Sequence, residues 1–210
     1  MIRIDKSGIE ISTNIRDQRE RLRALFDTEN FLRLPKLISS DLLEELYAQI
    51  LQSGWEPKSH DGIGEEVCVN DHSIEGLINF LLNDQELFDL IEGLTGCPPI
   101  GSFAGRVYRM VPGSGHYDSW HSDFGEHRLL ALTINMSKEI YQGGVLQIRE
   151  RHAPSNMREI SNTEFGNAIL FRLGANLEHR VTSIEGAVPK TAFAGWFRSE
   201  PKFWESFGSI

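Results

Sequence analysis

The hydrophobic residues in the first half of the chain recur every three or four positions, as they do on one face of an amphipathic helix. In residues 41–54 the apolar positions are Leu42, Leu43, Leu46, Tyr47 and Ile50. Asp41 and Glu44 form a capping-box pattern at the start of this segment, and Gly54 follows its last apolar position. We therefore predict a helix here whose apolar face packs against the rest of the protein.

The same period predicts two more helices before residue 97. The first carries an apolar stripe made of Ile74, Leu77, Ile78 and Leu81. The second is expected to begin at Asn83, which Glu86 follows three residues later, and to end between Gly93 and Gly96. We interpret both helices as packing layers.

The pattern changes after Pro98 and Pro99. Short runs of β-branched and aromatic residues now alternate with turns that are rich in Gly, Asn and Pro. These runs cover residues 106–111, 129–136, 144–149, 167–172, 179–184 and 191–197. Short strands without helical patterns between them are typical of an antiparallel sandwich or barrel, the jelly roll among them.

A length of 210 residues fits a single domain. Within it we expect four parts: an N-terminal extension at 1–30, a helical support at 31–100, the β-rich core at 101–200 and a C-terminal tail at 201–210. The fold class predicted from this order is α+β, mainly β, with the N-terminal helical layer packed on the β-rich core.

Composition narrows the choice of partners. The chain has 21 Lys and Arg against 30 Asp and Glu, a net charge of -9, which argues against nucleic acid because such binding depends on cationic side chains. The spacing of Cys68 and Cys97 fits neither a disulfide framework nor a structural zinc site. The sequence also has no signal-peptide pattern and no apolar run long enough to cross a bilayer. We expect a cytoplasmic protein that binds no membrane.

The chemistry is carried by histidine and aspartate. Two His-x-Asp triplets occur five residues apart, at His116 to Asp118 and at His121 to Asp123. On a strand such a spacing points an imidazole and a carboxylate to the same face, where both can bind one metal ion. His179, at the head of a predicted strand, is a candidate third ligand, and two histidines with one carboxylate suit Fe(II). A strand-end histidine with a structural hydrogen bond is the competing interpretation of His179.

Lys190 opens the last predicted strand. Alternation places its side chain on the same face as those of Ala192, Ala194 and Trp196. A lysine at this position is either a surface cation or the partner of an anion inside the barrel. The two alanines would leave room for such a ligand.

From Arg106 to Phe197 the chain resembles the Fe(II)- and 2-oxoglutarate-dependent oxygenase superfamily, and within it the prolyl-4-hydroxylase-like branch. The matching motifs, in chain order, are Pro112-Gly113, Tyr117, His121-Ser122-Asp123, Thr133-Ile134-Asn135, Gly143-Gly144-Val145-Leu146, residues 166–171, His179-Arg180-Val181, and Lys190 six residues before Trp196-Phe197. The resemblance implies that the β-rich core is a double-stranded β-helix, or jelly roll.

The resemblance also implies which residues bind the metal, the cosubstrate and the substrate. It favours His121 over His116, because the family places its metal histidine at this distance from the Pro-Gly turn. His121, Asp123 and His179 would bind Fe(II), and Lys190, in place of the commoner arginine, would pair with the distal carboxylate of 2-oxoglutarate. Further cosubstrate contacts would come from Thr133, where many relatives have a tyrosine, and from Tyr108. The substrate rim would include Tyr117, Trp120, Phe124 and His127.

The implied activity is that of an enzyme, a 2-oxoglutarate-dependent dioxygenase. It would use Fe(II), 2-oxoglutarate and O2 to hydroxylate an unactivated C–H bond, with release of succinate and CO2. The substrate would be a peptidyl, amino-acid or small-metabolite molecule. Two alternatives from other classes are a cupin-like metal-binding protein or isomerase that needs no 2-oxoglutarate, and a non-catalytic binding module.

Overall fold

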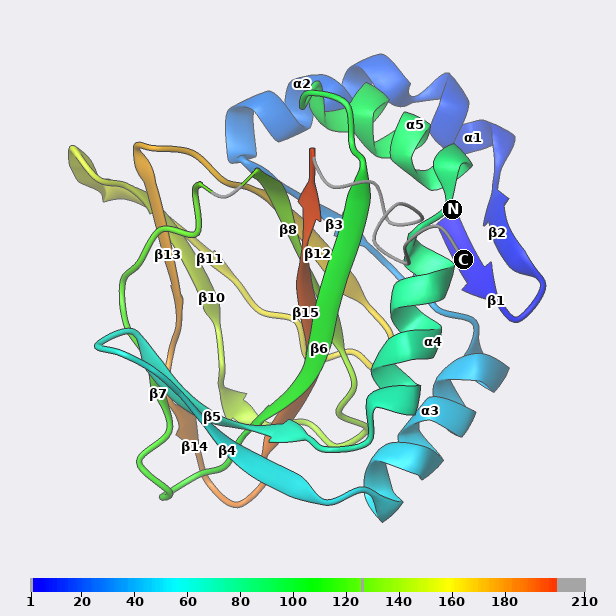
Figure 1. The fold of residues 1–210 in the computed structure, drawn as a ribbon. Coiled ribbons are helices and arrows are strands. Elements are labelled where there is room, and N and C mark those ends of the chain that lie inside the picture. The colour runs from blue at the N-terminus through cyan, green and yellow to red at the C-terminus, as the bar shows by residue number, and fades with distance from the viewer. Residues whose placement is uncertain (1, 126, 200–210) are drawn as a thin grey trace.

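The computed structural model describes residues 2–125 and 127–199, and the predicted C-terminal tail at 201–210 lies outside them. Within the described residues two antiparallel sheets face each other, and the helices gather on the outer side of the larger sheet (Figure 1). This arrangement confirms the predicted class, an α+β and mainly β fold with a jelly-roll core and an N-terminal helical layer.

The larger sheet has the strand order β3-β12-β8-β15-β6-β5-β4, and β7 pairs with β5 beside it. Its strands are β3 (Phe31–Leu34), β4 (Trp55–His60), β5 (Gly64–Val69), β6 (Ser102–Met110), β7 (Tyr117–Asp118), β8 (Arg128–Asn135), β12 (Ala168–Arg172) and β15 (Lys190–Arg198). The smaller sheet consists of β11 (Ala153–Ile160), β10 (Leu146–Glu150) and β13 (Leu177–Val181). Two short pairs complete the set: β1 (Ile2–Asp5) with β2 (Gly8–Ile11), and β9 (Gln142–Gly143) with β14 (Ile184–Glu185).

The predicted strands correspond to β6, β8, β10, β12, β13 and β15. Strand β11 was missed because most of its side chains are exposed, so it lacks the apolar alternation that marks a half-buried strand. The segment 31–100 contains β3, β4 and β5 as well as helices. The β4–β5 hairpin was not predicted for a similar reason: charged residues occupy both of its faces, so its strands lack apolar alternation.

The helices are α1 (Thr13–Asp17), α2 (Arg19–Glu29), α3 (Ser40–Gln52), α4 (His72–Leu82) and α5 (Gln85–Thr95). The last three confirm the helices predicted from apolar periodicity. The expected capping box is wrong, because α3 begins one residue before Asp41 and its N-cap is Ser39. The expected start of the third helix is also wrong: Asp84 is the N-cap of α5 and accepts the backbone N–H of Leu87 at 3.0 Å.

The outer face of the larger sheet is apolar and packs against the helices. On β15 the side chains of Phe193 and Phe197 are fully buried in the main hydrophobic cluster. The ring of Phe197 lies 4.7 Å from that of Phe103 on β6 and 6.0 Å from that of Phe88 on α5, measured between centroids. The helical layer therefore supplies the cover that this face requires.

Helix α4 also completes one edge of the sheet. Strand β15 pairs along the whole of β6, whereas β5 pairs with β6 only at Val67 and Cys68. Side chains one helical turn apart, two on α4 and one at its C-cap, bond to the backbone along the rest of this edge. The contacts, at 2.8–3.0 Å, join Asn83 to Phe103, Asn79 to Gly105 and Glu75 to Val107.

Two other expectations concern features outside the core. Both cysteines, Cys68 and Cys97, are free, as expected for a chain without a disulfide framework. Among the described residues, the longest apolar stretch of any helix falls short of the length that a bilayer requires.

Candidate active site

The three predicted metal ligands come together between the two sheets. His121 lies in the connection between β7 and β8, and His179 lies in β13. The two backbones form an antiparallel bridge: the N–H of His121 donates to the carbonyl of His179 at 3.1 Å, and the N–H of His179 donates back at 2.9 Å. This bridge holds the two imidazole rings 4.3 Å apart, measured between centroids.

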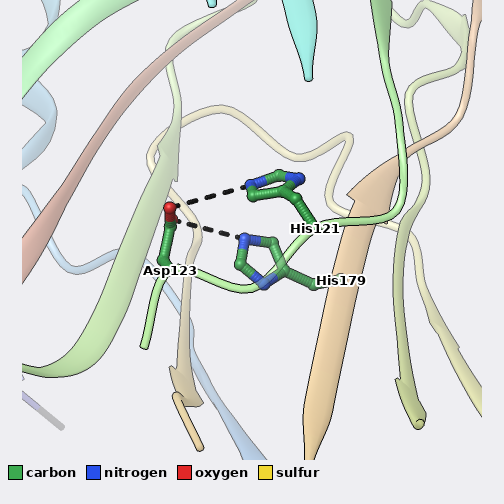
Figure 2. A group of neighbouring side chains, drawn as sticks. All are labelled: His121, Asp123 and His179. Carbon is green, nitrogen blue, oxygen red and sulfur yellow. Dashed lines mark ion pairs between the residues drawn. The ribbon is translucent and has the colours of Figure 1, made fainter. Parts of the chain in front are cut away.

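Asp123 faces both rings (Figure 2). Its Oδ1 lies 3.8 Å from Nε2 of His121, and its Oδ2 lies 3.5 Å from Nε2 of His179. One ligand atom from each of the three residues falls within 4.8 Å of the others. Two imidazole nitrogens and one carboxylate at this spacing match the donor set that non-haem Fe(II) prefers, with the remaining coordination positions left for other ligands.

Neighbouring groups set the orientation of His121 and the charge of Asp123. His121 directs Nδ1 toward the carbonyl of Ser119 at 2.8 Å and toward a carboxylate oxygen of Asp118 at 3.3 Å. A proton on Nδ1 leaves the lone pair of Nε2 available on the side of Asp123. Burial alone would raise the pKa of Asp123, but the hydrogen bond and charge of His179, the hydrogen bond of Trp196 and the charge of His121 together outweigh it and lower this pKa to about 2. The carboxylate is therefore ionised at neutral pH.

The three residues open into a cavity of about 550 Å³ between the sheets. Its lining includes the inner face of the larger sheet, the β4–β5 hairpin and part of the smaller sheet. Lys190, Thr133 and Tyr108, the predicted cosubstrate contacts, all belong to this lining. A cavity of this size accommodates a small organic ligand together with part of a second one.

Lys190 lies inside the barrel and not on the surface. Its side chain is buried, and the ammonium donates a hydrogen bond to the carbonyl of Gly144 at 3.0 Å. Burial lowers the pKa of Lys190 to about 8, although Asp118 and Glu66 act in the opposite direction. A buried ammonium beside a cavity is a ready partner for an anionic group.

The predicted rim residues divide into two groups. Tyr117 lines the cavity and is also exposed. Trp120, Phe124 and His127 are not part of the lining. The guanidinium groups of Arg149 and Arg180 lie 3.8 and 4.7 Å from the ring centroid of Trp120, while Phe124 points to solvent. His127 adopts a left-handed backbone conformation at the start of β8. Only Tyr117 among the four therefore borders the cavity directly.

Arg106 also lines the cavity, although the sequence did not predict a role for it. Its Nε and Nη2 donate to Glu66 at 3.2 and 2.7 Å, and Nη2 lies 2.9 Å from Nε2 of His60. All three residues line the cavity, and two of them come from the β4–β5 hairpin. Because Arg106 is two residues from Tyr108, strand alternation places both side chains on the inner face of β6. The partners of Arg106 could not be predicted, because they belong to a hairpin that has no recognisable strand pattern.

The second His-x-Asp triplet separates into two roles. Nδ1 of His116 accepts the backbone N–H of Val111 at 3.0 Å, which closes the loop between β6 and β7. Asp118 points the other way, into the cavity, where it accepts the backbone N–H of Val181 at 2.7 Å. The rival histidine is thus a loop residue, as the family resemblance implies, while the rival aspartate supports the site.

Two facing antiparallel sheets with a His-Asp-His group and a buried lysine between them define a class, the metal-dependent oxygenases of the double-stranded β-helix type. Residues 105–198, which contain all of these groups, match the family model described as the 2OG-Fe(II) oxygenase superfamily. Over these residues the chain is similar to the 2OG-Fe(II) oxygenase superfamily, and the match supports a 2-oxoglutarate-dependent dioxygenase, whose family uses Fe(II), 2-oxoglutarate and O2.

Solved structures with the same fold cover most of the chain. A prolyl-4-hydroxylase from Pseudomonas putida has a TM-score of 0.66 and 17% identity, with 87% of this chain and 100% of the other covered. A prolyl hydroxylase from Trichoplax adhaerens, in complex with a hypoxia inducible factor peptide fragment, has a TM-score of 0.66 and 18% identity, with 95% and 98% covered. An oxidoreductase of the 2OG-Fe(II) oxygenase family from Burkholderia pseudomallei has a TM-score of 0.66 and 14% identity, with 88% and 92% covered. No curated protein sequence matches the chain.

Proposed function

We propose that this protein hydroxylates an unactivated C–H bond of a peptidyl, amino-acid or small-metabolite substrate, with His121, Asp123 and His179 as the ligands of Fe(II). Lys190 holds the distal carboxylate of 2-oxoglutarate. The observation that carries the proposal is the convergence of three ligand atoms within 4.8 Å of one another and a buried ammonium on one cavity.

When bound, Fe(II) supplies the activation of O2, which is coupled to conversion of 2-oxoglutarate into succinate and CO2. The residues of this chain supply binding and orientation. His121, Asp123 and His179 would hold the metal with two imidazoles and one carboxylate, and a set of three protein ligands would leave coordination positions for the cosubstrate and O2. The ammonium of Lys190, which lies where water is scarce, attracts a carboxylate more strongly than a surface lysine would.

The two sides of the cavity differ, and this difference supports a separate place for each ligand. Lys190 and Thr133 belong to the inner face of the larger sheet, and the small side chain of Ala194 beside Thr133 leaves space above it. The β4–β5 hairpin and Tyr117 form the exposed side of the cavity. We assign the first region to 2-oxoglutarate and the second to the substrate, which is a small molecule or a peptide. The peptide complex of the Trichoplax relative supports the inclusion of peptides.

The proposal is tested by cosubstrate turnover and by ligand-induced stability. Anaerobic Fe(II) with 2-oxoglutarate is expected to raise the melting temperature, because both ligands bind only the folded chain. Asp123→Ala is expected to abolish both this increase and the formation of succinate. Unchanged succinate formation in this variant would contradict the ligand assignment.

Two further variants separate the alternatives. His116→Ala is the matched control, since it removes a nearby histidine that contacts a loop backbone and not the metal group. It should retain iron binding and succinate formation. Lys190→Ala should retain iron binding and lose the effect of 2-oxoglutarate; a cupin-like metal protein would be indifferent to this change, and a non-catalytic module would bind no iron in any variant.

A further inference from the structure

We propose that Trp196 is a positioning residue of the metal centre, and that its indole N–H, with the guanidinium of Arg128 stacked on its ring, orients the carboxylate of Asp123 toward the metal. The inference rests on the proposed role of Asp123 as a metal ligand. Metal affinity then depends not only on the His-Asp-His group but also on Trp196 of β15.

Asp123 needs such a device because no strand holds it. The sequence reading placed His121 and Asp123 on one strand, but His121 takes part only in an isolated bridge and Asp123 lies in irregular backbone. His179 by contrast is fixed in β13, opposite Ile148 of β10. The orientation of the carboxylate is therefore left to contacts that its side chain makes.

Two of these contacts come from the larger sheet. Nε1 of Trp196 donates to Oδ2 of Asp123 at 2.8 Å, and Nη1 of Arg128 donates to Oδ1 at 3.3 Å. Each carboxylate oxygen thus has one donor from the larger sheet in addition to the histidine that it faces. Rotation of the carboxylate about its side-chain bonds would break at least the shorter of these bonds.

Trp196 is itself well fixed. It lies in β15, in register with Ala131 of β8 on one side and Ala104 of β6 on the other. The guanidinium of Arg128 stacks on its ring at 4.2 Å from the centroid. A tryptophan in a central strand, between two alanines and under a cation, provides a donor of fixed position.

Partners that orient metal ligands typically change metal affinity by a factor of 10 to 100 when they are removed. Trp196→Phe removes the N–H and keeps an aromatic ring under Arg128, so it isolates the hydrogen bond. We expect the dissociation constant for Co2+, measured by calorimetry, to rise by about 10-fold or more in this variant. Trp55→Phe is the matched control, because the ring of Trp55 also lies against an arginine, Arg109, at 4.0 Å and is not part of the cavity lining.

The outcomes distinguish three cases. Weaker Co2+ binding in Trp196→Phe, with wild-type affinity in Trp55→Phe and similar melting temperatures of the metal-free variants, supports the inference. Wild-type affinity in Trp196→Phe, or an equal loss in both variants, overturns it. If the wild-type protein binds no Co2+, the proposed function fails instead.

A measurement on the wild-type protein covers the possibility that Trp196→Phe does not fold. The chain has four tryptophans, and variants of the other three, Trp55, Trp120 and Trp204, identify the indole N–H signal of Trp196 in the NMR spectrum by elimination. Addition of Zn2+ should move this signal and leave that of Trp55 in place, since the indole of Trp196 bonds to Asp123 while Trp55 lies against Arg109 and outside the cavity lining. A Trp196 signal that stays unchanged on metal binding would rule the hydrogen bond out as part of the centre.

Discussion

The two faces of β15 are buried by different means. On the outer face Phe193 and Phe197 are enclosed by other apolar side chains from the sheet and the helical layer. On the inner face Lys190 and Trp196 are enclosed by the cavity wall and keep polar contacts. One strand of alternating residues thus separates the part of the protein that provides stability from the part that provides chemistry. Substitutions on the two faces should differ accordingly.

The largest effect is expected on the outer face. Phe197→Ala removes a fully buried ring in contact with Phe103 and Phe88, and the loss should be about 3–5 kcal/mol of unfolding free energy. Urea denaturation measures it. Phe124→Ala is the matched control, because this phenylalanine is 56% exposed and its loss should change stability by less than about 0.5 kcal/mol. Similar losses in both variants would contradict the assignment of the outer face to the core.

The inner face is expected to show its effect in binding. Lys190→Met keeps most of the side-chain volume and removes the charge, and the affinity for 2-oxoglutarate should fall by about 2–5 kcal/mol, the usual effect of removing one partner of a buried ion pair. Calorimetry with Fe(II) under anaerobic conditions measures it. Lys138→Met, at an exposed lysine, is the control and should bind 2-oxoglutarate as the wild type does. A loss of less than 10-fold in Lys190→Met would place the distal carboxylate elsewhere.

The same variant should stabilise the protein when no cosubstrate is present. Burial lowers the pKa of Lys190 to about 8 from 10.5, so at neutral pH the folded state carries a charge that it disfavours. Between pH 8 and 10.5 the unfolded chain holds this proton and the folded chain does not, so this group makes stability rise with pH. Lys190→Met should therefore gain about 3 kcal/mol over the wild type at pH 7, and the gain should vanish near pH 10.5. Urea denaturation at several pH values checks this, and a gain that persists at high pH would contradict it.

Sequence periodicity was sufficient for the elements that form the two faces. The alternation of β15 placed Lys190 and Trp196 on one side and Phe193 on the other, as the structure has them. The helical stripes of α3, α4 and α5 were equally readable, because each helix buries one face. Both patterns arise from burial, and the apolar or polar character of each residue indicates whether its position is buried.

Contacts between polar side chains could not be predicted in this way. The contact of Trp196 with Asp123 depends on how a loop lies against the middle of a sheet, and neither residue has a local signal for it. The same holds for Arg106 and Glu66, whose pairing depends on the position of the β4–β5 hairpin. Family motifs indicated the three candidate ligands and Lys190 and included Trp196, but they gave no supporting role to Trp196, Arg106 or Glu66, because these contacts depend on tertiary structure.

The smallest expected effect concerns the polar contacts of Asn83 with the backbone of β6, and it tests whether the two sides of the sheet are independent. Asn83 was predicted to start a helix, but its side-chain amide both accepts from and donates to the backbone of Phe103 at 2.8 Å, where no strand pairs with this edge. Asn83→Ala leaves two buried backbone groups without these partners and should cost about 1–3 kcal/mol of unfolding free energy. Asn14→Ala, at an exposed asparagine of α1, is the control. Because Asn83 lies on the helical side of the sheet, its loss should leave Co2+ affinity unchanged, and a parallel loss of metal binding would show that the two sides of the sheet are coupled.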